Sequence, residues 1–338
     1  HTGLWTVMTA TFTRVDSSRQ LNDGHQIRRQ NNGTPTVGVL LSSYNGVNYI
    51  REQLGSIYSQ RGVRVHLIVR DDGSSDGTAD VVERYAAEHE DSNVTLSCIR
   101  GRNAGFLKSF EWLLAHTSGC GYYAFSDQDD FWQPNKLLAA LSVLQDEAGP
   151  ALYASTTTIA DEHLNVLGKN EFPEFTYSLE SEIMRHRLAG HTMVWNDALH
   201  RFMGKVNALP CWSHDQHLTI VSLLSGGKLL LDHSSYVLHR RLQSSLTPGG
   251  GSPGKRLRHE WDMVRNSAGT FNRARLASAL LDEYAGTFDE STSRFLENCI
   301  HYRDSIARRL TFLASPSVSC GLTLGDAEAR LAILLGTF

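Results

Sequence analysis

The sequence has few features that would place it outside the ordinary globular proteins. Its apolar runs are short, as at 37–41 and 229–231, whereas a membrane-spanning helix needs about 20 apolar residues. Its charges nearly balance, with 32 Lys and Arg against 36 Asp and Glu among 338 residues. The formal net charge of −4 offers no bulk attraction for nucleic acid. We therefore expect neither a membrane-spanning helix nor a nucleic-acid partner.

Disulfide and zinc signatures are also missing. The chain has five cysteines, and none belongs to a C-x-x-C pair, which argues against a disulfide framework or a structural zinc site. The first residues lack the compact apolar core of a secretory signal, so a reducing, cytoplasmic location is the simplest interpretation. The glycine run at 249–251 lacks the Lys-Ser/Thr of a phosphate-binding loop, which makes a kinase-like interpretation weak.

What the sequence does have is an alternation of strand and helix patterns. Buried strands are predicted over 37–43, 63–69, 94–100 and 122–126, and amphipathic helices over 49–60, 75–87 and 106–116. Such alternation predicts a parallel sheet with helices on both faces. After a helix at 135–144, isolated strand patterns at 152–157, 192–195 and 228–231 predict that the sheet becomes mixed. The fold class is therefore α/β.

Composition divides the chain into four parts. Residues 1–34 are mostly polar and are predicted to be a flexible N-terminal segment. Residues 35–246 carry the sheet pattern, and 247–254 form a Gly/Pro linker that blocks both helix and strand. Residues 255–338 contain amphipathic stretches with few breakers, so we expect a helical C-terminal region that packs on the sheet domain or on another subunit.

Polar residues follow three of the predicted strands at their carboxyl ends, where open parallel sheets bind ligands. These residues are 43–45, 71–72 and 127–129. The carboxylates of Asp127, Asp129 and Asp130 are crowded and would repel one another unless a cation such as Mg²⁺ or Mn²⁺ lay among them. Considered without its neighbours, this cluster also fits an Asp-rich helix cap.

Two further loops are ambiguous when they are considered alone. Asp71 and Asp72 stand beside Gly73, where they could hold a base or ribose or could simply form a turn and a helix cap. The stretch 102–105 offers a cation, an amide and a glycine to a phosphate or sugar, but turns of this composition are common.

Several motifs occur together in one order and carry a resemblance. They are Ser43-Tyr44-Asn45-Gly46, Glu52-Gln53-Leu54, Asp71-Asp72-Gly73-Ser74-Ser75-Asp76, and Ser126-Asp127-Gln128-Asp129-Asp130-Phe131-Trp132 followed by Pro134-Asn135-Lys136. This set resembles a family-2 glycosyltransferase of the GT-A fold, a Rossmann-like mixed sheet. The S-D-Q-D-D-x-W form is similar to a bacterial branch of rhamnosyltransferases and related glycan enzymes. A weaker likeness at 190–193, 213–215 and 239–241 extends it over about 35–246.

The resemblance implies a role for each matching residue. Asp215 would be the catalytic base, and Asp129 and His239 would bind the metal, Mg²⁺ or Mn²⁺. Gly190, His191 and His214 would lie on the acceptor side. The sequence departs from the branch at 216–217, where Trp-Trp is common, so the acceptor contacts do not follow from the motif. The nucleotide-sugar would be bound by Tyr44, Asn45, Asp71, Asp72, Arg102, Asn103, Gly105, Asp127, Gln128, His239, Arg240 and Arg241.

The implied activity is an inverting, metal-dependent transfer of a sugar, with rhamnose suggested by the branch. The donor would be a dTDP- or UDP-linked sugar, and the acceptor a glycan, a lipid-linked molecule or another hydroxyl compound of cell-surface polysaccharide synthesis. Two alternatives stay open, a nucleotidyltransferase and a non-catalytic protein that binds nucleotide-sugars.

The C-terminal region carries a separate prediction. Basic residues at 256, 258, 265, 273 and 275 precede the apolar stretch 331–335, a pattern that can lie on an anionic membrane surface. Peripheral contact with the inner face of the membrane would suit a lipid-linked acceptor. Packing on the catalytic domain or formation of a homodimer explains the same pattern.

Overall fold

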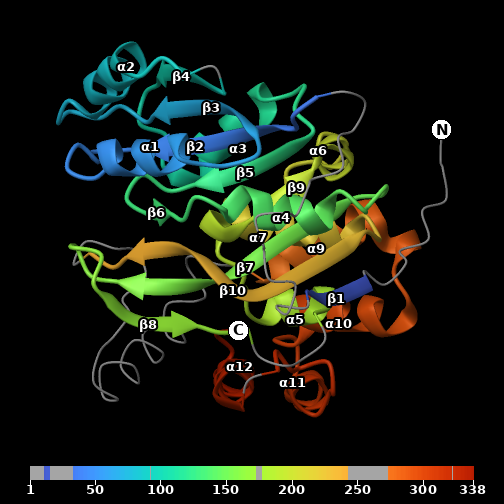
Figure 1. The fold of residues 1–338 in the computed structure, drawn as a ribbon. Coiled ribbons are helices and arrows are strands. Elements are labelled where there is room, and N and C mark those ends of the chain that lie inside the picture. The colour runs from blue at the N-terminus through green and yellow to red at the C-terminus, as the bar shows by residue number, and fades with distance from the viewer. Residues whose placement is uncertain (1–10, 16–32, 92, 173–176, 243–272, 322) are drawn as a thin grey trace.

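A mixed β-sheet runs through the centre of the molecule (Figure 1). The computed structural model describes residues 11–15, 33–91, 93–172, 177–242, 273–321 and 323–338. Over these residues the sheet has ten strands in the order β4-β3-β2-β5-β9-β7-β10-β1, with β6 paired to β10 and β8 to β7. The strands are β1 (Thr11–Val15), β2 (Thr36–Ser43), β3 (Arg64–Asp71), β4 (Val94–Arg100), β5 (Tyr122–Ser126), β6 (Phe131–Trp132), β7 (Ala151–Ala160), β8 (Val166–Asn170), β9 (Val194–Asn196) and β10 (Lys228–Arg240).

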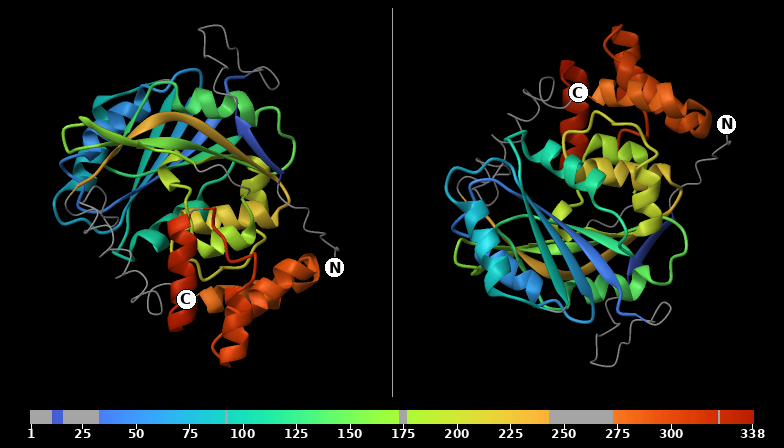
Figure 2. Two further views of the ribbon diagram at one scale, coloured as in Figure 1. Left: turned by 90° about the horizontal axis from the view of Figure 1, so that it is seen from below. Right: turned by 90° about the horizontal axis from the view of Figure 1, so that it is seen from above.

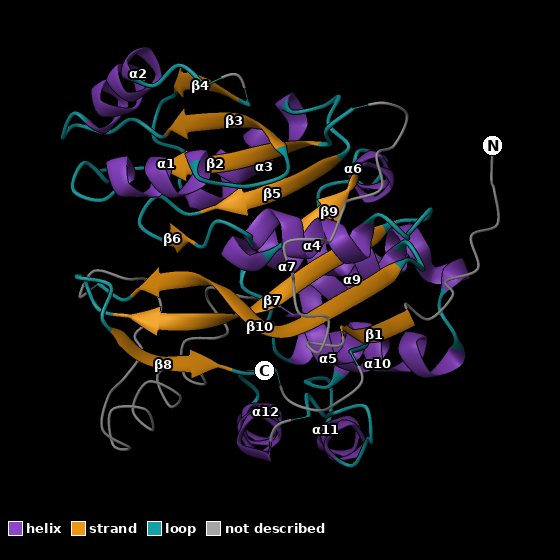
Figure 3. Cartoon of the chain, in the orientation of Figure 1, coloured by secondary structure: helices purple, strands orange, loops and turns teal. Residues whose placement is uncertain are grey.

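Helices cover both faces of this sheet (Figures 2 and 3). Apolar side chains of α1 (Ile50–Tyr58), α2 (Thr78–Glu88) and α4 (Lys136–Leu144) form one core against it. Those of α3 (Phe106–His116), α6 (Asp197–Met203) and α7 (His214–Leu224) form the core on the other face. The helices on two faces confirm the α/β class.

The parallel half of the sheet confirms the predicted alternation. Strands β4, β3, β2 and β5 are parallel, with Ser43 opposite Asp71 and Leu41 opposite Ser126. Strand β9 is antiparallel to both β5 and β7, which makes the sheet mixed as expected. This register brings the polar residues after β2, β3 and β5 to one edge, the edge at which such sheets bind ligands.

Three strands were not predicted. Strand β1 lies inside the segment 1–34 that we expected to be flexible, and it pairs in parallel with β10. Strands β6 and β8 are short edge partners of β10 and β7. Strand β10 also continues nine residues beyond the predicted end at Leu231. The apolar run stops there because the residues that follow are mostly polar, and the pairing with β7 continues through two register shifts.

The C-terminal residues form the expected helical appendage from residue 273 onward. Helices α9 (Arg273–Tyr284), α10 (Glu290–His301), α11 (Ile306–Leu313) and α12 (Thr323–Leu335) share an apolar core with α5 (Leu179–Met184) and α7. Figure 2 shows them beyond the α5–α7 layer, away from the sheet. The predicted linker 247–254 and the basic residues at 256, 258 and 265 lie outside the described residues. Among the helices that the structure describes, none is long and apolar enough to cross a bilayer.

Candidate active site

The loop after β2 is fastened to the loop after β3. Asn45 adopts a positive φ of 48°, which non-glycine residues rarely do and Asn tolerates best. Its Oδ1 accepts a hydrogen bond from the Ser75 backbone amide at 2.9 Å, and its own amide donates to Ser74 Oγ at 2.9 Å. The Asn45 side chain thus shapes the loop, in which the neighbouring Tyr44 is 48% exposed.

Gln128 connects that loop to the end of β5. Its Nε2 donates to the Tyr44 carbonyl at 3.0 Å, and its Oε1 accepts from the Tyr44 amide at 2.9 Å. A Cβ on Gly46 would lie 2.2 Å from the same Oε1, so only glycine leaves room for this clamp. Three predicted nucleotide-site residues therefore form one structural unit, although their contacts to a nucleotide stay a prediction.

Asp71 and Asp72 are buried and already well bonded. Asp71 accepts the Ser74 amide at 2.9 Å, whereas Asp72 pairs with Arg70 and accepts the backbone amides of Ala104 and Gly105 at 3.0 and 2.9 Å. Asp72 thereby fastens the loop 101–105 beside β3. The side chains of Arg102 and Asn103 are exposed in that loop, where a ligand at the sheet edge can reach them.

Four metal-ligating residues meet at the ends of β5 and β10. One ligand atom from each of Asp127, Asp130, His191 and His239 lies within 4.8 Å of the others. His239 Nδ1 is 2.7 Å from Asp130 Oδ1, and His191 Nδ1 is 3.5 Å from Asp127 Oδ2. The two imidazole rings stack with centroids 4.4 Å apart, and Thr157 Oγ1 lies 3.0 Å from His191 Nε2.

The chemistry of these donors fits a divalent cation. Asp130 Oδ2 is buried and has no hydrogen-bond partner among the described residues, so one carboxylate oxygen is left for an ion. Burial lowers the pKa of His239, but Asp130 and the nearby carboxylates outweigh it and raise this pKa to about 9. His239 is therefore protonated at neutral pH, and it would have to release its proton to bind an ion. Carboxylate and imidazole ligands together suit Mn²⁺, whereas Mg²⁺ prefers oxygen ligands.

Two metal ligands were predicted, Asp129 and His239. His239 belongs to this group of four, and Asp129 does not. Burial, together with the charges of Asp130 and Asp127, raises the pKa of Asp129 to about 7. A cation would favour its ionised form. The structure adds Asp130 and His191 as candidate ligands, and the role of Asp129 stays a prediction.

Asp215 lies in the first turn of α7, where Ser213 caps the helix. Its Oδ2 accepts the Gly190 amide at 3.1 Å, and its Oδ1 accepts the Gln216 amide at 2.9 Å. Burial raises the pKa of Asp215, but the cationic imidazole of His186 outweighs it and holds this pKa below its ordinary value. Gly190 contacts Asp215, and the next residue, His191, belongs to the group of Asp127, Asp130, His191 and His239, which we call the four-ligand group. One short segment therefore joins the two.

Two predicted site residues are engaged in packing. His214 stacks on Phe110 with centroids 3.7 Å apart, and burial lowers its pKa, so it is neutral and part of the core. Arg240 is buried, pairs with Glu52 and lies over the Tyr49 ring. A contact between Arg240 and a diphosphate would require it to leave Glu52. Arg241 continues the strand pairing through a bond from its amide to the Ala160 carbonyl, 2.9 Å long.

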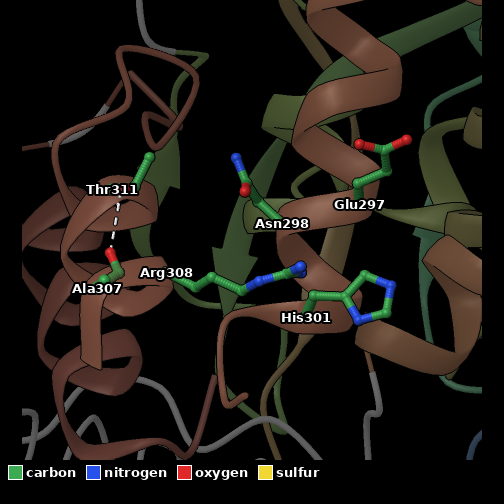
Figure 4. Close-up of a pocket in the computed structure, with 6 residues that line it drawn as sticks. All are labelled: Glu297, Asn298, His301, Ala307, Arg308 and Thr311. Carbon is green, nitrogen blue, oxygen red and sulfur yellow. Dashed lines mark hydrogen bonds between the residues drawn. The ribbon is translucent and has the colours of Figure 1, made fainter. Parts of the chain in front are cut away.

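A surface groove of about 520 Å³ lies elsewhere, between α10 and α11 (Figure 4). It belongs to the helical appendage, and none of the predicted site residues lines it. Its lining is Glu297, Asn298, His301, Ala307, Arg308 and Thr311. The candidate active site is therefore defined by the strand ends and not by this groove.

Sequence reasoning did not find His186 and Glu182. Their spacing of four residues was visible, but a His and a Glu at that spacing are common on helices, and no motif drew attention to them. Only the fold brings His186 against Asp215.

Residues 39–200 match the model of Glycosyl transferase family 2. RfbG of Shigella flexneri, named a dTDP-rhamnosyl transferase, is 33% identical over 107 residues, which are 31% of this chain and 36% of that protein. TuaG of Bacillus subtilis, named for teichuronic acid biosynthesis, is 29% identical over 140 residues, 40% of this chain and 54% of that protein. The chain thus spans about half or less of the length of these relatives.

Residues 1–349 of S. aureus TarS, solved with UDP-GlcNAc, superpose with a TM-score of 0.50 at 16% identity, covering 90% of this chain and 89% of that one. At this identity the likeness concerns the fold alone, which is GT-A. The fold is therefore of the GT-A class, in which the carboxyl ends of the strands carry the candidate site. The match at residues 39–200 covers about half of this chain, and over those residues the chain is similar to glycosyl transferase family 2.

Proposed function

We propose that this protein transfers a sugar from a nucleoside diphosphate to a hydroxyl acceptor, with inversion and with the help of a divalent cation. The observation that carries the proposal is the segment 190–191, in which one residue bonds the candidate base Asp215 and the next lies among Asp127, Asp130 and His239. A proton acceptor beside a cation site is what a single displacement at an anomeric carbon needs.

In the proposed reaction the acceptor oxygen attacks the anomeric carbon while Asp215 takes the hydroxyl proton. The bond from that carbon to the diphosphate oxygen breaks, and its electron pair leaves with the nucleoside diphosphate. Asp129, Asp130 and His239 would hold Mg²⁺ or Mn²⁺, which neutralises the charge that develops on the diphosphate. Attack from the opposite face inverts the anomeric centre.

The nucleotide would lie along the edge formed by the ends of β2 and β3. The exposed Tyr44 ring offers an apolar face to a base, and Arg102 and Asn103 are exposed beside it. Asp71 and Asp72 would act mainly by holding these loops, because their carboxylates are buried and bonded.

We propose dTDP-rhamnose as the donor to test before others, with UDP-linked sugars as the second choice. The likeness to RfbG supports the first, and the acceptor would be a growing polysaccharide, as the name of TuaG suggests for that relative.

The test is incubation of the protein with dTDP-, UDP- and GDP-linked sugars, with Mn²⁺ or with chelator, followed by mass spectrometry. Release of a nucleoside diphosphate together with a glycosylated acceptor or free sugar supports the proposal. A product that carries the nucleotide would instead indicate a nucleotidyltransferase. Binding of a donor, detected as a rise in Tm, without any turnover would indicate a non-catalytic binder.

We also propose that the appendage contacts an anionic membrane surface on the cytoplasmic side. Ile306 and Leu310 lie one turn apart on α11 and are 76% and 56% exposed. Arg309 of the same helix donates to the Leu334 carbonyl at 3.2 Å, which places the exposed end of α12 beside them. Exposed apolar side chains next to arginine match the chemistry of an interfacial helix.

The membrane proposal is tested by flotation with vesicles that contain anionic lipid. Ile306→Ser combined with Leu310→Ser should lower the bound fraction, while Val166→Ser, a change at an exposed apolar residue on β8, should not. Equal flotation of all three proteins contradicts membrane contact. If the double variant instead converts a dimer into a monomer, this face is a homodimer interface.

A further inference from the structure

His186 lies between two carboxylates, one of which is the candidate base. Its Nδ1 is 2.5 Å from Glu182 Oε1, and its Nε2 is 3.3 Å from Asp215 Oδ1. Glu182 belongs to α5, and Asp215 belongs to α7, so the histidine joins two helices that pack against each other. The order carboxylate, imidazole, carboxylate places charges of alternating sign in a buried row.

The row is buried at its Glu182 end and reaches the surface only at Asp215. Glu182 is fully buried, and the His186 side chain is only 7% exposed, whereas Asp215 keeps 18% of its side chain exposed. Burial opposes the charged form of His186, but Glu182 and Asp215 outweigh it and raise the pKa of this histidine to about 10. His186 is therefore a cation at neutral pH, and its charge is balanced inside the protein.

The contacts of Asp215 leave its carboxylate little freedom to turn. One oxygen accepts the Gly190 amide, and the other accepts the Gln216 amide and lies 3.3 Å from His186 Nε2, an ion-pair contact without hydrogen-bond geometry. A Cβ on Gly190 would lie 3.3 Å from Asp215 Cβ, so the segment 189–191 closes tightly over the base. The partly exposed Asp215 side chain is thus held in one orientation.

We propose that His186 is a positioning residue for the catalytic base, and that Glu182 holds it in its charged form. The proposal rests on the glycosyl transfer proposed above. A carboxylate held in this orientation can accept the proton of the acceptor hydroxyl without first turning. Small losses of such alignment lower the reaction rate considerably. The imidazolium also keeps Asp215 ionised to lower pH than an isolated buried carboxylate.

The other titratable groups beside Glu182, His186 and Asp215 do not supply a second cation in contact with Asp215. His214, from α7, is neutral because burial lowers its pKa, and Glu182 faces Tyr177 and Arg187 as well as His186. The Trp212 ring lies edge-on to the imidazole, with centroids 6.3 Å apart. His186 is therefore the cation in direct contact with Asp215, and its removal should raise the pKa of the base.

The experiment compares His186→Gln with the parent and with His200→Gln. His200 is a matched control, since it is a partly buried histidine that stacks on Tyr123 and contacts the Thr117 carbonyl, outside the site. The pH profile of kcat is measured on the donor that the parent uses. A double-mutant cycle of His186→Gln with Asp215→Asn is followed by Tm, a readout that does not need activity.

His186→Gln should lower kcat by about 10- to 100-fold and move the acid limb of the profile upward by about one pH unit, with the donor KM within a few-fold of the parent. In the double-mutant cycle, the Tm change of the double variant should differ from the sum of the changes caused by His186→Gln and Asp215→Asn alone. Glu182→Gln should lower kcat in the same direction and serves if His186→Gln does not fold.

An unchanged kcat and acid limb in folded His186→Gln overturns the positioning role, even if the Tm cycle shows an ion pair, because the pair is then only structural. Equal losses in His200→Gln also overturn it, since the effect would be one of general packing. A parent without transfer on any donor marks the failure of the proposed function instead. The Tm cycle then still reports whether His186 and Asp215 are coupled.

Discussion

His239 Nδ1 lies 2.7 Å from Asp130 Oδ1, although 109 residues separate the two in the chain. The contact joins the end of β10 to the turn after β5, and it occupies one oxygen of a fully buried carboxylate. The other oxygen has no hydrogen-bond partner among the described residues. A buried carboxylate in this state is stabilised when a cation completes its coordination.

We therefore expect Asp130→Asn and His239→Ala to weaken cation binding. In the parent, Mn²⁺ together with a nucleoside diphosphate should raise Tm, because both bind the folded state. Each variant should lose most of this rise and most of the Mn²⁺-dependent turnover. His233→Ala provides the control, since this β10 histidine contacts Phe172 and not the four-ligand group. An Mn²⁺ response in Asp130→Asn equal to that of the parent would contradict the site.

Asp215→Asn tests the proposed role of Asp215 as the base. The amide keeps the shape of the side chain but cannot accept the proton, so kcat should fall by about 10²- to 10⁴-fold. Nucleotide binding, measured by the Tm rise with dTDP or UDP and Mn²⁺, should change by no more than a few-fold. The matched control is Asp197→Asn, which changes the first turn of α6 in the same way and should keep its activity. Loss of nucleotide binding in Asp215→Asn would instead place this residue in the donor site.

The predictable part of the fold is the part that local periodicity specifies. Strands β2 and β5 are apolar runs that end in polar residues, and β3 is apolar from Leu67 to Val69. Their parallel direction follows from the helices between them. Strand β1 could not be predicted in this way, because its residues Thr11–Val15 show no long pattern and its only described sheet partner is β10, more than 200 residues later.

The candidate site likewise contains residues that the local sequence reveals and partners that only the fold brings together. Asp127, Asp129 and Asp130 could be recognised because one strand end carries them together. The partners of Asp215 and Arg240 could not, since His186 and Glu52 lie on other elements and only the packing of α5 on α7, and of α1 beside β10, brings them near. Motif likeness names residues, but it does not say which of them are already bonded.

The clamp between Gln128 and Tyr44 leads to a third prediction. Gln128→Ala removes two hydrogen bonds that hold the Tyr44 backbone, each worth about 1 kcal/mol. The donor KM should rise by about 10-fold while kcat changes little, because the clamp shapes the proposed nucleotide side and does not touch Asp215. Steady-state kinetics at saturating Mn²⁺ measure both constants. A change confined to kcat would show that this loop does not shape the donor site.

Lys136 carries the last prediction, which concerns stability. The residue is buried, its Nζ has no hydrogen-bond partner in the described structure, and it lies 3.6 Å from the centroid of the Trp132 ring. Burial lowers its pKa from 10.5 to about 7, against the opposing charge of Asp130. Lys136→Met keeps an unbranched chain over the ring and removes the ammonium, so it should stabilise the fold by about 1–2 kcal/mol near pH 6.

The pH dependence of this gain has a definite sign. Between pH 7 and 10.5 the unfolded chain binds the lysine proton more often than the folded chain does, so the parent becomes more stable as pH rises through this window. The advantage of Lys136→Met should therefore be full below pH 7 and shrink towards pH 10.5. Urea unfolding at pH 6, 8 and 9.5 measures it, with Lys228→Met as the control because that lysine is 45% exposed and pairs with Glu147. An advantage that grows with pH, or a destabilised variant at pH 6, would mean that the buried ammonium is favourable where it lies.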